Sequence, residues 1–279
     1  MTSVQDFLDR ARVLDKLLEG ELLLADVLKV SRESVFAHPE RMLGPRAVSQ
    51  VESMWQRVEK GEPMAYVLGK KEFFGLEFKV DSRALIPRPE TEHLVETILG
   101  LVKDFENPRI LDVGTGCGAI ALALQHALPR ATVFGSDVSK EAISLAQENA
   151  KKLGLEQVIF EVSDLLKDIS PEAQNVDVLV ANLPYIGTEK FHFVEKSVQE
   201  FEPDVALFGG IDGLQLYKQF FDQINCSSCD PKWVLGEFGS LQREMLEDMI
   251  KKAFPEAKIT FHQDLAGLDR YFVIQLTHA

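Results

Sequence analysis

Strand and helix patterns alternate through the sequence from residue 109 to residue 276. Short aliphatic and β-branched runs, typical of strands buried on both faces, cover residues 109–113, 131–137, 158–164, 176–181 and 232–238. Helical patterns separate these runs, and two more strand patterns, 258–264 and 270–276, follow the last helix. The alternation predicts a doubly wound α/β domain, whose ligands bind beyond the carboxyl ends of the parallel strands.

A glycine-rich loop follows the first of these strands. It consists of Gly114, Thr115, Gly116, Cys117 and Gly118, and a helix begins directly after it. Glycines here let the backbone approach a ligand, and the helix N-terminus points N–H groups at it. The next strand ends in Asp137, about 20 residues on, where nucleotide-binding folds place a ribose-binding carboxylate. The pair predicts a site for NAD, FAD or S-adenosylmethionine; the alternative is a tight turn with a helix-capping acid.

Two further acids fall near the same edge of the predicted sheet. Asp164 ends the third strand, where its carboxylate can accept from an adenine amino group or cap the next helix. Leu165 would then pack against the adenine ring. Asp112 precedes the glycine-rich loop and either orients the loop backbone or contacts the methionine amino group of a cofactor.

The fourth strand delivers Asn182, Leu183, Pro184 and Tyr185 at its carboxyl end. Pro184 keeps Leu183 out of the helical region, so we expect the Leu183 carbonyl to turn outward beside the Asn182 side-chain oxygen. Two adjacent acceptors fit both N–H groups of one planar –NH₂ group, and the Tyr185 ring offers it a flat face. The loop has no strong base, which suits a reaction governed by alignment with an activated electrophile. An asparagine before a proline is also a common turn former.

In combination, these motifs resemble the release-factor glutamine methyltransferases (HemK/PrmC family), which are class I S-adenosylmethionine-dependent methyltransferases. The resemblance rests on Asp-x-Gly-x-Gly-x-Gly, the acids that follow it, and Asn-x-Pro-Tyr, and extends from about residue 20 to the C-terminus. The most specific match is Pro-Arg-Pro-Glu-Thr-Glu at 87–92. Other matching segments are residues 61–69, 72–75, 85–86, 202–203, 206–210 and 212–214.

The resemblance implies a Rossmann-like class I methyltransferase sheet that ends in an antiparallel C-terminal hairpin. It implies S-adenosylmethionine as cofactor, S-adenosylhomocysteine as product and no metal. The cofactor residues would be the five of the glycine-rich loop together with Asp137, Asp164, Leu165 and Asn182.

The substrate implied by the family is the glutamine in the Gly-Gly-Gln motif of class 1 peptide-chain release factors. Asn182, Leu183, Pro184 and Tyr185 would hold its amide for methylation, and Arg88 and Glu90 would border the pocket; without the resemblance, these two belong to a solvated linker. Two residues depart from the family pattern. Leu183 replaces the usual first proline, and we expect activity to survive because only its carbonyl is needed. Cys117 replaces a serine or threonine of similar size.

Domain organisation follows from the change of periodicity along the chain. Helical patterns over residues 1–62 predict a small all-α domain, with one long helix over 3–20; it is either a packing cap or, as the resemblance implies, a docking module for the protein substrate. Alternating residues predict a β-hairpin linker over 63–84, and the methyltransferase domain covers 85–279. The acids Glu200, Glu202 and Asp204 are interpreted as a solvated face.

Composition limits the partners. Among 279 residues, 30 basic and 44 acidic side chains give a net charge of −14, which argues against direct binding to nucleic acid. We find no membrane-spanning run or secretory signal, so we expect a cytoplasmic protein, and a monomer. Cys226 and Cys229 lack the second ligand pair of a zinc site, which indicates structural thiols rather than zinc or redox chemistry.

Three alternatives remain open from the residues. A base-amine methyltransferase acting on DNA or RNA would hold a flipped adenine or cytosine in the same loop, although the acidic charge counts against it. A catalytically silent cofactor-binding module is a second alternative, because Leu183 departs from the family pattern in the loop proposed for catalysis. A dehydrogenase is the weakest alternative, because it gives no role to the loop of Asn182, Leu183, Pro184 and Tyr185, called the Asn182 loop below.

Overall fold

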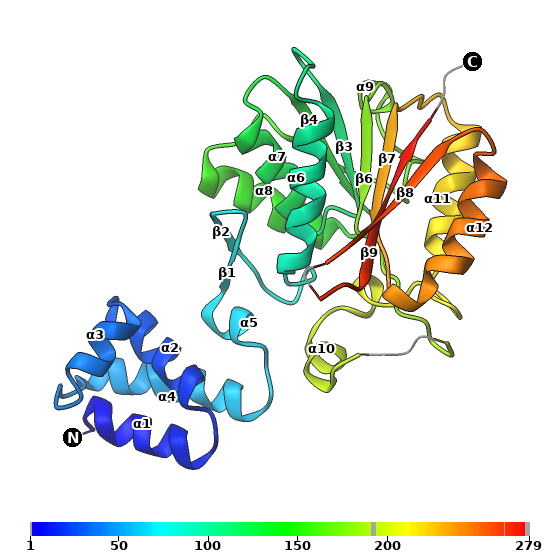
Figure 1. Cartoon of the computed structure of the whole chain (residues 1–279). Coiled ribbons are helices and arrows are strands. Elements are labelled where there is room, and N and C mark those ends of the chain that lie inside the picture. Colours follow the sequence, from blue (N-terminus) through cyan, green and yellow to red (C-terminus); the bar gives the residue numbers. More distant parts are fainter. Residues whose placement is uncertain (1, 191–193, 265, 277–279) are drawn as a thin grey trace. The chain divides into compact units, whose positions relative to one another are not determined.

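The computed structural model describes residues 2–190, 194–264 and 266–276 (Figure 1). The chain divides into two compact units, Met1–Lys70 and Lys71–Ala279. No helix in the described part is both long and apolar enough to cross a membrane.

The N-terminal unit is all-α. Its helices are α1 (Val4–Val13), α2 (Leu17–Leu28), α3 (Arg32–Ala37), α4 (Pro45–Glu59) and α5 (Met64–Leu68). Helix α1 begins with a capping box, in which Ser3 and Asp6 each bond the other's backbone N–H. Phe7 packs edge-on against Trp55, with ring centroids 5.2 Å apart, inside a core that the helices of this unit share. The expected helical N-terminal region is confirmed.

The single helix expected over 3–20 is wrong, because the chain turns between α1 and α2. Asp15 adopts a left-handed φ of 56° in this turn. Gly20 lies inside α2, and a Cβ there would be 2.7 Å from the Cβ of Ala11, so the two helices pack closely at this point. The apolar spacing continues through the turn because α1 and α2 face one core, and spacing alone does not reveal the break.

Residues 63–84 contain both a helix and a hairpin. Residues 64–68, expected in the hairpin, form α5, and the strands are β1 (Lys70–Phe73) and β2 (Leu76–Lys79). The buried Asn149 side chain accepts from Lys79 N at 2.7 Å and donates to Lys79 O at 3.0 Å and to Cys117 O at 2.9 Å. Asn149 therefore ties the end of the hairpin to the glycine-rich loop.

The C-terminal unit is built on a mixed sheet of seven strands within the described residues. Its strands are β3 (Arg109–Val113), β4 (Thr132–Asp137), β5 (Ile159–Val162), β6 (Val178–Ala181), β7 (Trp233–Glu237), β8 (Lys258–Gln263) and β9 (Asp269–Gln275). Their order is β5-β4-β3-β6-β7-β9-β8. Strands β3 to β7 are parallel, whereas β9 runs antiparallel to both of its neighbours. The predicted doubly wound sheet with an antiparallel C-terminal hairpin is confirmed.

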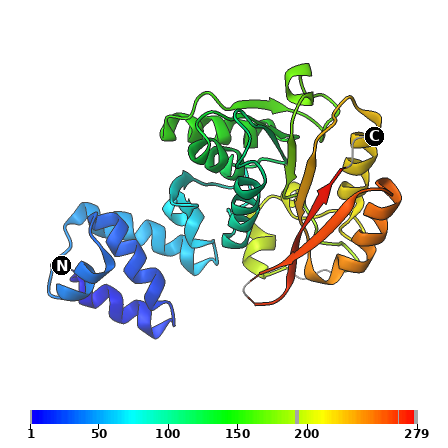
Figure 2. The ribbon, with the colours of Figure 1, turned by 45° about the horizontal axis from the view of Figure 1, so that its top comes forward.

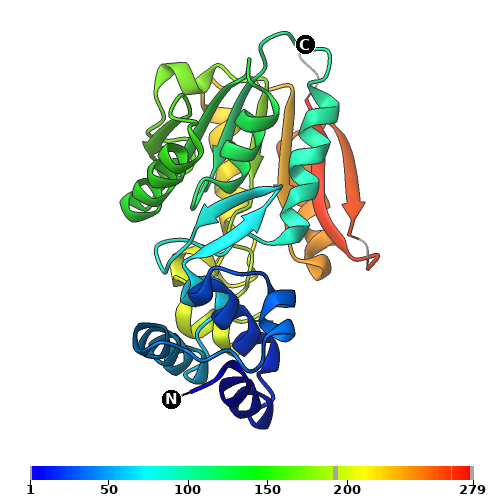
Figure 3. The same ribbon diagram turned by 90° about the vertical axis from the view of Figure 1, so that its left-hand side faces the viewer.

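Helices cover both faces of this sheet. The helices of this unit are α6 (Glu92–Leu101), α7 (Ala119–Ala127), α8 (Lys140–Leu153), α9 (Pro171–Gln174), α10 (Lys196–Phe201), α11 (Gln215–Cys226) and α12 (Arg243–Ala253), with short 3₁₀ turns η1 (Pro89–Thr91), η2 (Asp204–Ala206) and η3 (Ser240–Gln242), within the described residues. Helices α6, α7 and α8 lie on one face and α11 and α12 on the other (Figures 1 and 3). Strands β8 and β9 lie beside α12 (Figure 2).

The strand order reverses between β3 and β6. From β3 the chain adds β4 and β5 on one side, then returns to add β6 and β7 on the other. The loops that leave the carboxyl ends of β3 and β6 therefore diverge and open a crevice, which is the usual ligand site of such sheets.

Candidate active site

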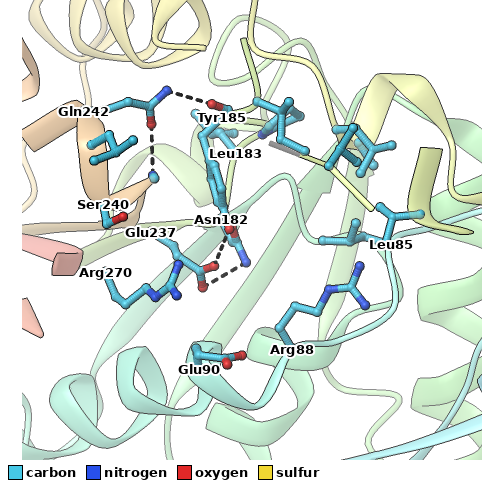
Figure 4. Close-up of a pocket in the computed structure, with 18 of the residues that line it drawn as sticks. Leu85, Arg88, Glu90, Asn182, Leu183, Tyr185, Glu237, Ser240, Gln242 and Arg270 are labelled. Carbon is cyan, nitrogen blue, oxygen red and sulfur yellow. Dashed lines mark hydrogen bonds between the residues drawn. The ribbon is translucent and has the colours of Figure 1, made fainter. Parts of the chain in front are cut away.

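Two cavities meet at the carboxyl ends of β3 and β6. The glycine-loop cavity is lined by residues that include Gly114, Gly116, Asp137 and Leu165. The Glu237 cavity, of about 710 Å³, is lined by residues that include Tyr185, Glu237 and Arg270 (Figure 4). Both cavities share a wall, made of Leu85, Arg88, Asn182, Leu183, Pro184 and Ala206. The Asn182 loop thus separates two binding spaces.

The glycine-rich loop forms one side of the glycine-loop cavity. The N–H groups of Gly114 and Thr115 donate to Ser136 O at 2.8 and 2.9 Å, which holds the loop against β4. Gly118 has a φ of 84°, and a Cβ there would lie 3.1 Å from the Leu122 side chain. A side chain at this position would be strained by both conformation and space.

Acidic side chains also line the glycine-loop cavity. Asp137 accepts from Gly116 N and from Ser139 N, both at 2.9 Å, so it fastens the loop to the start of α8 while lining the cavity. Burial raises its pKa, although these bonds act in the opposite direction. Asp164 is exposed and Leu165 is buried with a φ of 55°, and both line the cavity. The structure brings the residues predicted for the cofactor together in this cavity, except Gly118, which does not line it.

Asp112 lies beneath the loop and does not line either cavity. Its Oδ2 accepts from Thr115 Oγ1 at 2.6 Å and from Ala121 N at 3.2 Å. Within the described residues, Oδ1 has no hydrogen-bond partner. Burial raises the pKa of Asp112 from 3.8 to about 7. These contacts support the first of its two predicted roles, the orientation of the loop.

A hydrogen-bond network holds the Asn182 loop from the side of β7. Asn182 Nδ2 donates to Glu237 Oε2 at 3.1 Å and to Thr91 Oγ1 at 3.2 Å. Thr91 Oγ1 itself donates to Glu237 Oε2 at 2.6 Å, and the Tyr185 hydroxyl donates to Glu237 Oε1 at 3.0 Å. Negative charge on Glu237, together with burial, raises the pKa of Tyr185. The network fixes both polar side chains of the loop.

Gln242 fixes the main chain of the same loop. Its side-chain amide donates to Tyr185 O at 2.7 Å (Figure 4) and to Asp212 O at 2.9 Å, and its oxygen accepts from Gly239 N at 2.9 Å. Since Gln242 is buried and makes three bonds, it is a rigid brace between the connection after β7 and the loop after β6.

One interpretation from sequence is wrong at Glu202. Its side chain is buried, not solvated, and accepts from Arg88 Nη2 at 2.6 Å and from Ile86 N at 3.0 Å. Glu200 and Asp204 are exposed, as expected. Glu202 therefore fastens the end of α10 to the segment that carries Arg88, because a buried carboxylate requires partners of this kind.

Arg88 and Glu90 both line the Glu237 cavity, together with Arg270 (Figure 4). Sequence reasoning selected the first two and missed Arg270, Glu237, Thr91 and Gln242. A signal for Glu237 was present, because it is an acid at the carboxyl end of a parallel strand, as Asp137 is. Arg270 and Gln242 carry no comparable local pattern.

Solved structures share the fold of this chain. The N-terminal domain of human METTL16 in complex with SAH aligns with a TM-score of 0.51 and 16% identity, over 74% of this chain and 77% of that one. Human methyltransferase 10 domain containing protein aligns with a TM-score of 0.54 and 16% identity, over 74% of this chain and 90% of that one. The strand order, the glycine-rich loop and this likeness define the class I methyltransferase fold.

Sequence matches identify the family. Residues 1–69 match the PrmC N-terminal domain and residues 104–244 match a methyltransferase domain. Release factor glutamine methyltransferase of Koribacter versatilis (strain Ellin345) is 38% identical over 256 residues, 92% of this chain and 90% of that protein. That of Bacillus subtilis (strain 168) is 35% identical over 255 residues, 90% of this chain and 88% of that protein. The chain belongs to the release factor glutamine methyltransferase family.

Proposed function

We propose that the protein methylates the side-chain amide nitrogen of the glutamine in the Gly-Gly-Gln motif of class 1 peptide-chain release factors. The donor is S-adenosylmethionine and the product S-adenosylhomocysteine. Family membership supports this substrate. The observation that carries the proposal is the shared wall, since Asn182 borders the glycine-loop cavity on one side and the Glu237 cavity on the other.

The residues of the glycine-loop cavity fit the donor. The loop presents backbone without side chains at Gly114 and Gly116, and carboxylates of Asp137 and Asp164 can accept from ribose hydroxyls and an adenine amino group. Thr115, Cys117, Gly118, Leu165 and Asn182 would complete this site. The bound donor supplies a methyl group activated by a positively charged sulfur. No metal is required by this chemistry.

The Glu237 cavity would take the glutamine and its neighbouring residues, since its volume lies in the range of ligand pockets. An amide nitrogen is a poor nucleophile because its lone pair is delocalised into the carbonyl. Asn182 Oδ1 and the Leu183 carbonyl would accept the two N–H bonds, which aligns the nitrogen and favours its developing positive charge. As the N–CH₃ bond forms and the S–CH₃ bond breaks, one of the two amide protons is released to water. The Tyr185 ring, held beside Pro184, would fix the amide plane, and Arg88 and Glu90 would contact the peptide.

We further propose the domain roles. The N-terminal helical unit docks the protein substrate, the hairpin links it to the methyltransferase unit, and the match of residues 1–69 to the PrmC N-terminal domain supports this division. The proposed substrate acts in translation, which is consistent with the expected cytoplasmic location, and the monomeric state remains a prediction.

The test is transfer of labelled methyl from S-adenosylmethionine to purified release factor. A release factor with Gln-to-Ala in its Gly-Gly-Gln motif is the matched control, and total DNA and RNA are offered in parallel. We expect label on the intact factor alone. Label on nucleic acid would instead establish the base-amine alternative, and cofactor binding without any transfer would establish the silent module.

A further inference from the structure

Glu237 occupies a position that couples it to the Asn182 loop. It is the last residue of β7, which pairs in parallel with β6 so that Gly236 lies beside Ala181. Asn182 and Glu237 therefore leave neighbouring strands at the same edge of the sheet. Glu237 is only 4% exposed. A carboxylate buried to this extent is retained only when its oxygens are paired, and here three donors reach it.

The contacts of Glu237 decide how the Asn182 carboxamide is turned. A carboxylate only accepts hydrogen bonds, so the Asn182 atom 3.1 Å from Glu237 Oε2 must be the –NH₂ group. Thr91 Oγ1 gives its own proton to Glu237 and is left to accept from the same –NH₂ group. The –NH₂ group of Asn182 is thus held on the side of β7. The carbonyl oxygen Oδ1 is directed away from Glu237.

The second oxygen of Glu237 acts on the aromatic ring of the loop. Oε1 accepts the Tyr185 hydroxyl proton at 3.0 Å, which fixes the far end of the ring. Gln242 holds the carbonyl of the same residue. Of the two braces, only Glu237 acts on the side chains that face the substrate.

We propose that Glu237 is a positioning residue that turns the Asn182 carbonyl oxygen and the Tyr185 ring toward the substrate amide. This role rests on the proposed function, because it concerns the same acceptor geometry. Glu237 itself does not touch the reacting atoms. It acts by removing the alternative orientation of Asn182, in which the –NH₂ group would face the substrate N–H bonds and repel them.

The proposal is tested on the full chain with variants of Glu237 whose side chains accept different numbers of hydrogen bonds. Glu237→Leu removes both acceptors, and we expect kcat for release-factor methylation to fall about 10- to 100-fold. Glu237→Gln keeps one oxygen for Thr91 and Asn182, while its –NH₂ group meets the Tyr185 hydroxyl, which can rotate to accept. We expect Glu237→Gln to retain most of the activity. KM and S-adenosylmethionine affinity, the latter by calorimetry, should change less than about threefold in both variants.

A double-mutant comparison separates positioning from a merely structural role. In an Asn182→Ala background the orientation of the carboxamide no longer matters, so Glu237→Leu should cost less in kcat than it does in the wild type, and the cost that remains comes from the lost Tyr185 contact. An equal loss in both backgrounds, or a loss confined to KM or cofactor affinity, would overturn the proposal. Glu244→Leu, at an exposed acid of α12 outside both cavities, is the matched control and should leave kcat unchanged.

Failure of the role of Glu237 can be distinguished from failure of a variant to fold and from failure of the proposed function. If Glu237→Leu does not fold, Glu237→Asp replaces it, because the shorter side chain withdraws the carboxylate from Asn182 without removing charge. The same fall in kcat and the same dependence on Asn182 are then expected. If the wild type methylates no release factor, the proposed function fails; if it does and every Glu237 variant matches it, only the role of Glu237 fails.

Discussion

The two cavities are built in different ways. One side of the glycine-loop cavity is made by consecutive residues, Val113 to Cys117, whose backbone conformation shapes it, although the rest of the lining comes from separate segments. The Glu237 cavity instead depends on a side-chain network behind its wall, in which Thr91, Asn182 and Glu237 meet only because the sheet brings their strands and turns together. A site formed by consecutive residues has a characteristic spacing of residue types in the sequence, whereas a network of side chains from distant segments has none.

The largest expected effect falls on the shared wall. Asn182→Ala removes one of the two acceptors proposed for the amide, and we expect kcat to fall about 100-fold or more while cofactor affinity changes little. Steady-state kinetics with release factor and calorimetry with the cofactor measure the two quantities. Asn225→Ala, at an exposed position of α11, is the control. An equal loss in cofactor affinity would show that Asn182 belongs mainly to the glycine-loop cavity.

Substitution in the glycine-rich loop should instead lower stability and cofactor affinity. Gly118→Ala introduces a side chain at a φ of 84° and 3.1 Å from Leu122, so we expect the free energy of unfolding to fall by about 1–3 kcal/mol and cofactor affinity to fall about tenfold. Gly154→Ala is matched in conformation, at a φ of 69°, but has open space around it. It should lose stability without losing cofactor affinity; equal losses of affinity in both variants would contradict the comparison.

The raised pKa of Asp112, beneath the glycine-rich loop, predicts that the free energy of unfolding depends on pH. Its folded-state pKa of about 7 lies above the ordinary 3.8, so the folded protein holds a proton that the unfolded chain has released. This contribution therefore favours folding at low pH and is lost as pH rises from about 4 to about 7.

The corresponding test compares the wild type with Asp112→Asn in the absence of cofactor. The free energy of unfolding from denaturant titrations should decline with pH more steeply in the wild type, by roughly 3 kcal/mol over this range. Parallel pH profiles of the two proteins would exclude a raised pKa at Asp112.

The smallest effect is expected at Leu183. Its buried side chain lies 3.2 Å from where a Cβ of Gly114 would be, so Leu183→Pro loses packing against the glycine-rich loop and about 1–2 kcal/mol of stability. We expect kcat to stay within about threefold, because proline retains the carbonyl. Thermal unfolding and kinetics of the one variant measure both. A large gain in kcat would mean that leucine slows this protein relative to its family.

Much of the fold was predictable, because buried parallel strands leave apolar runs and helices leave a 3.6-residue period. The glycine-rich loop and the Asn182 loop were predictable for the same reason, since each is a continuous segment. The turn between α1 and α2 was missed because both helices face one core, and Glu202 was missed because its partner Arg88 is distant in sequence. Local sequence patterns therefore do not predict which side chains, distant in sequence, the fold brings into contact.

The shared wall has a thermodynamic consequence. Because Asn182, Leu183 and Pro184 border both cavities, any adjustment of this loop on binding one ligand enters the binding free energy of the other. Linkage then requires the effect to be reciprocal: the factor by which the donor changes affinity for the release factor equals the factor by which the release factor changes affinity for the donor. Two ligands that occupy separate cavities would therefore change each other's affinity through one short segment of chain.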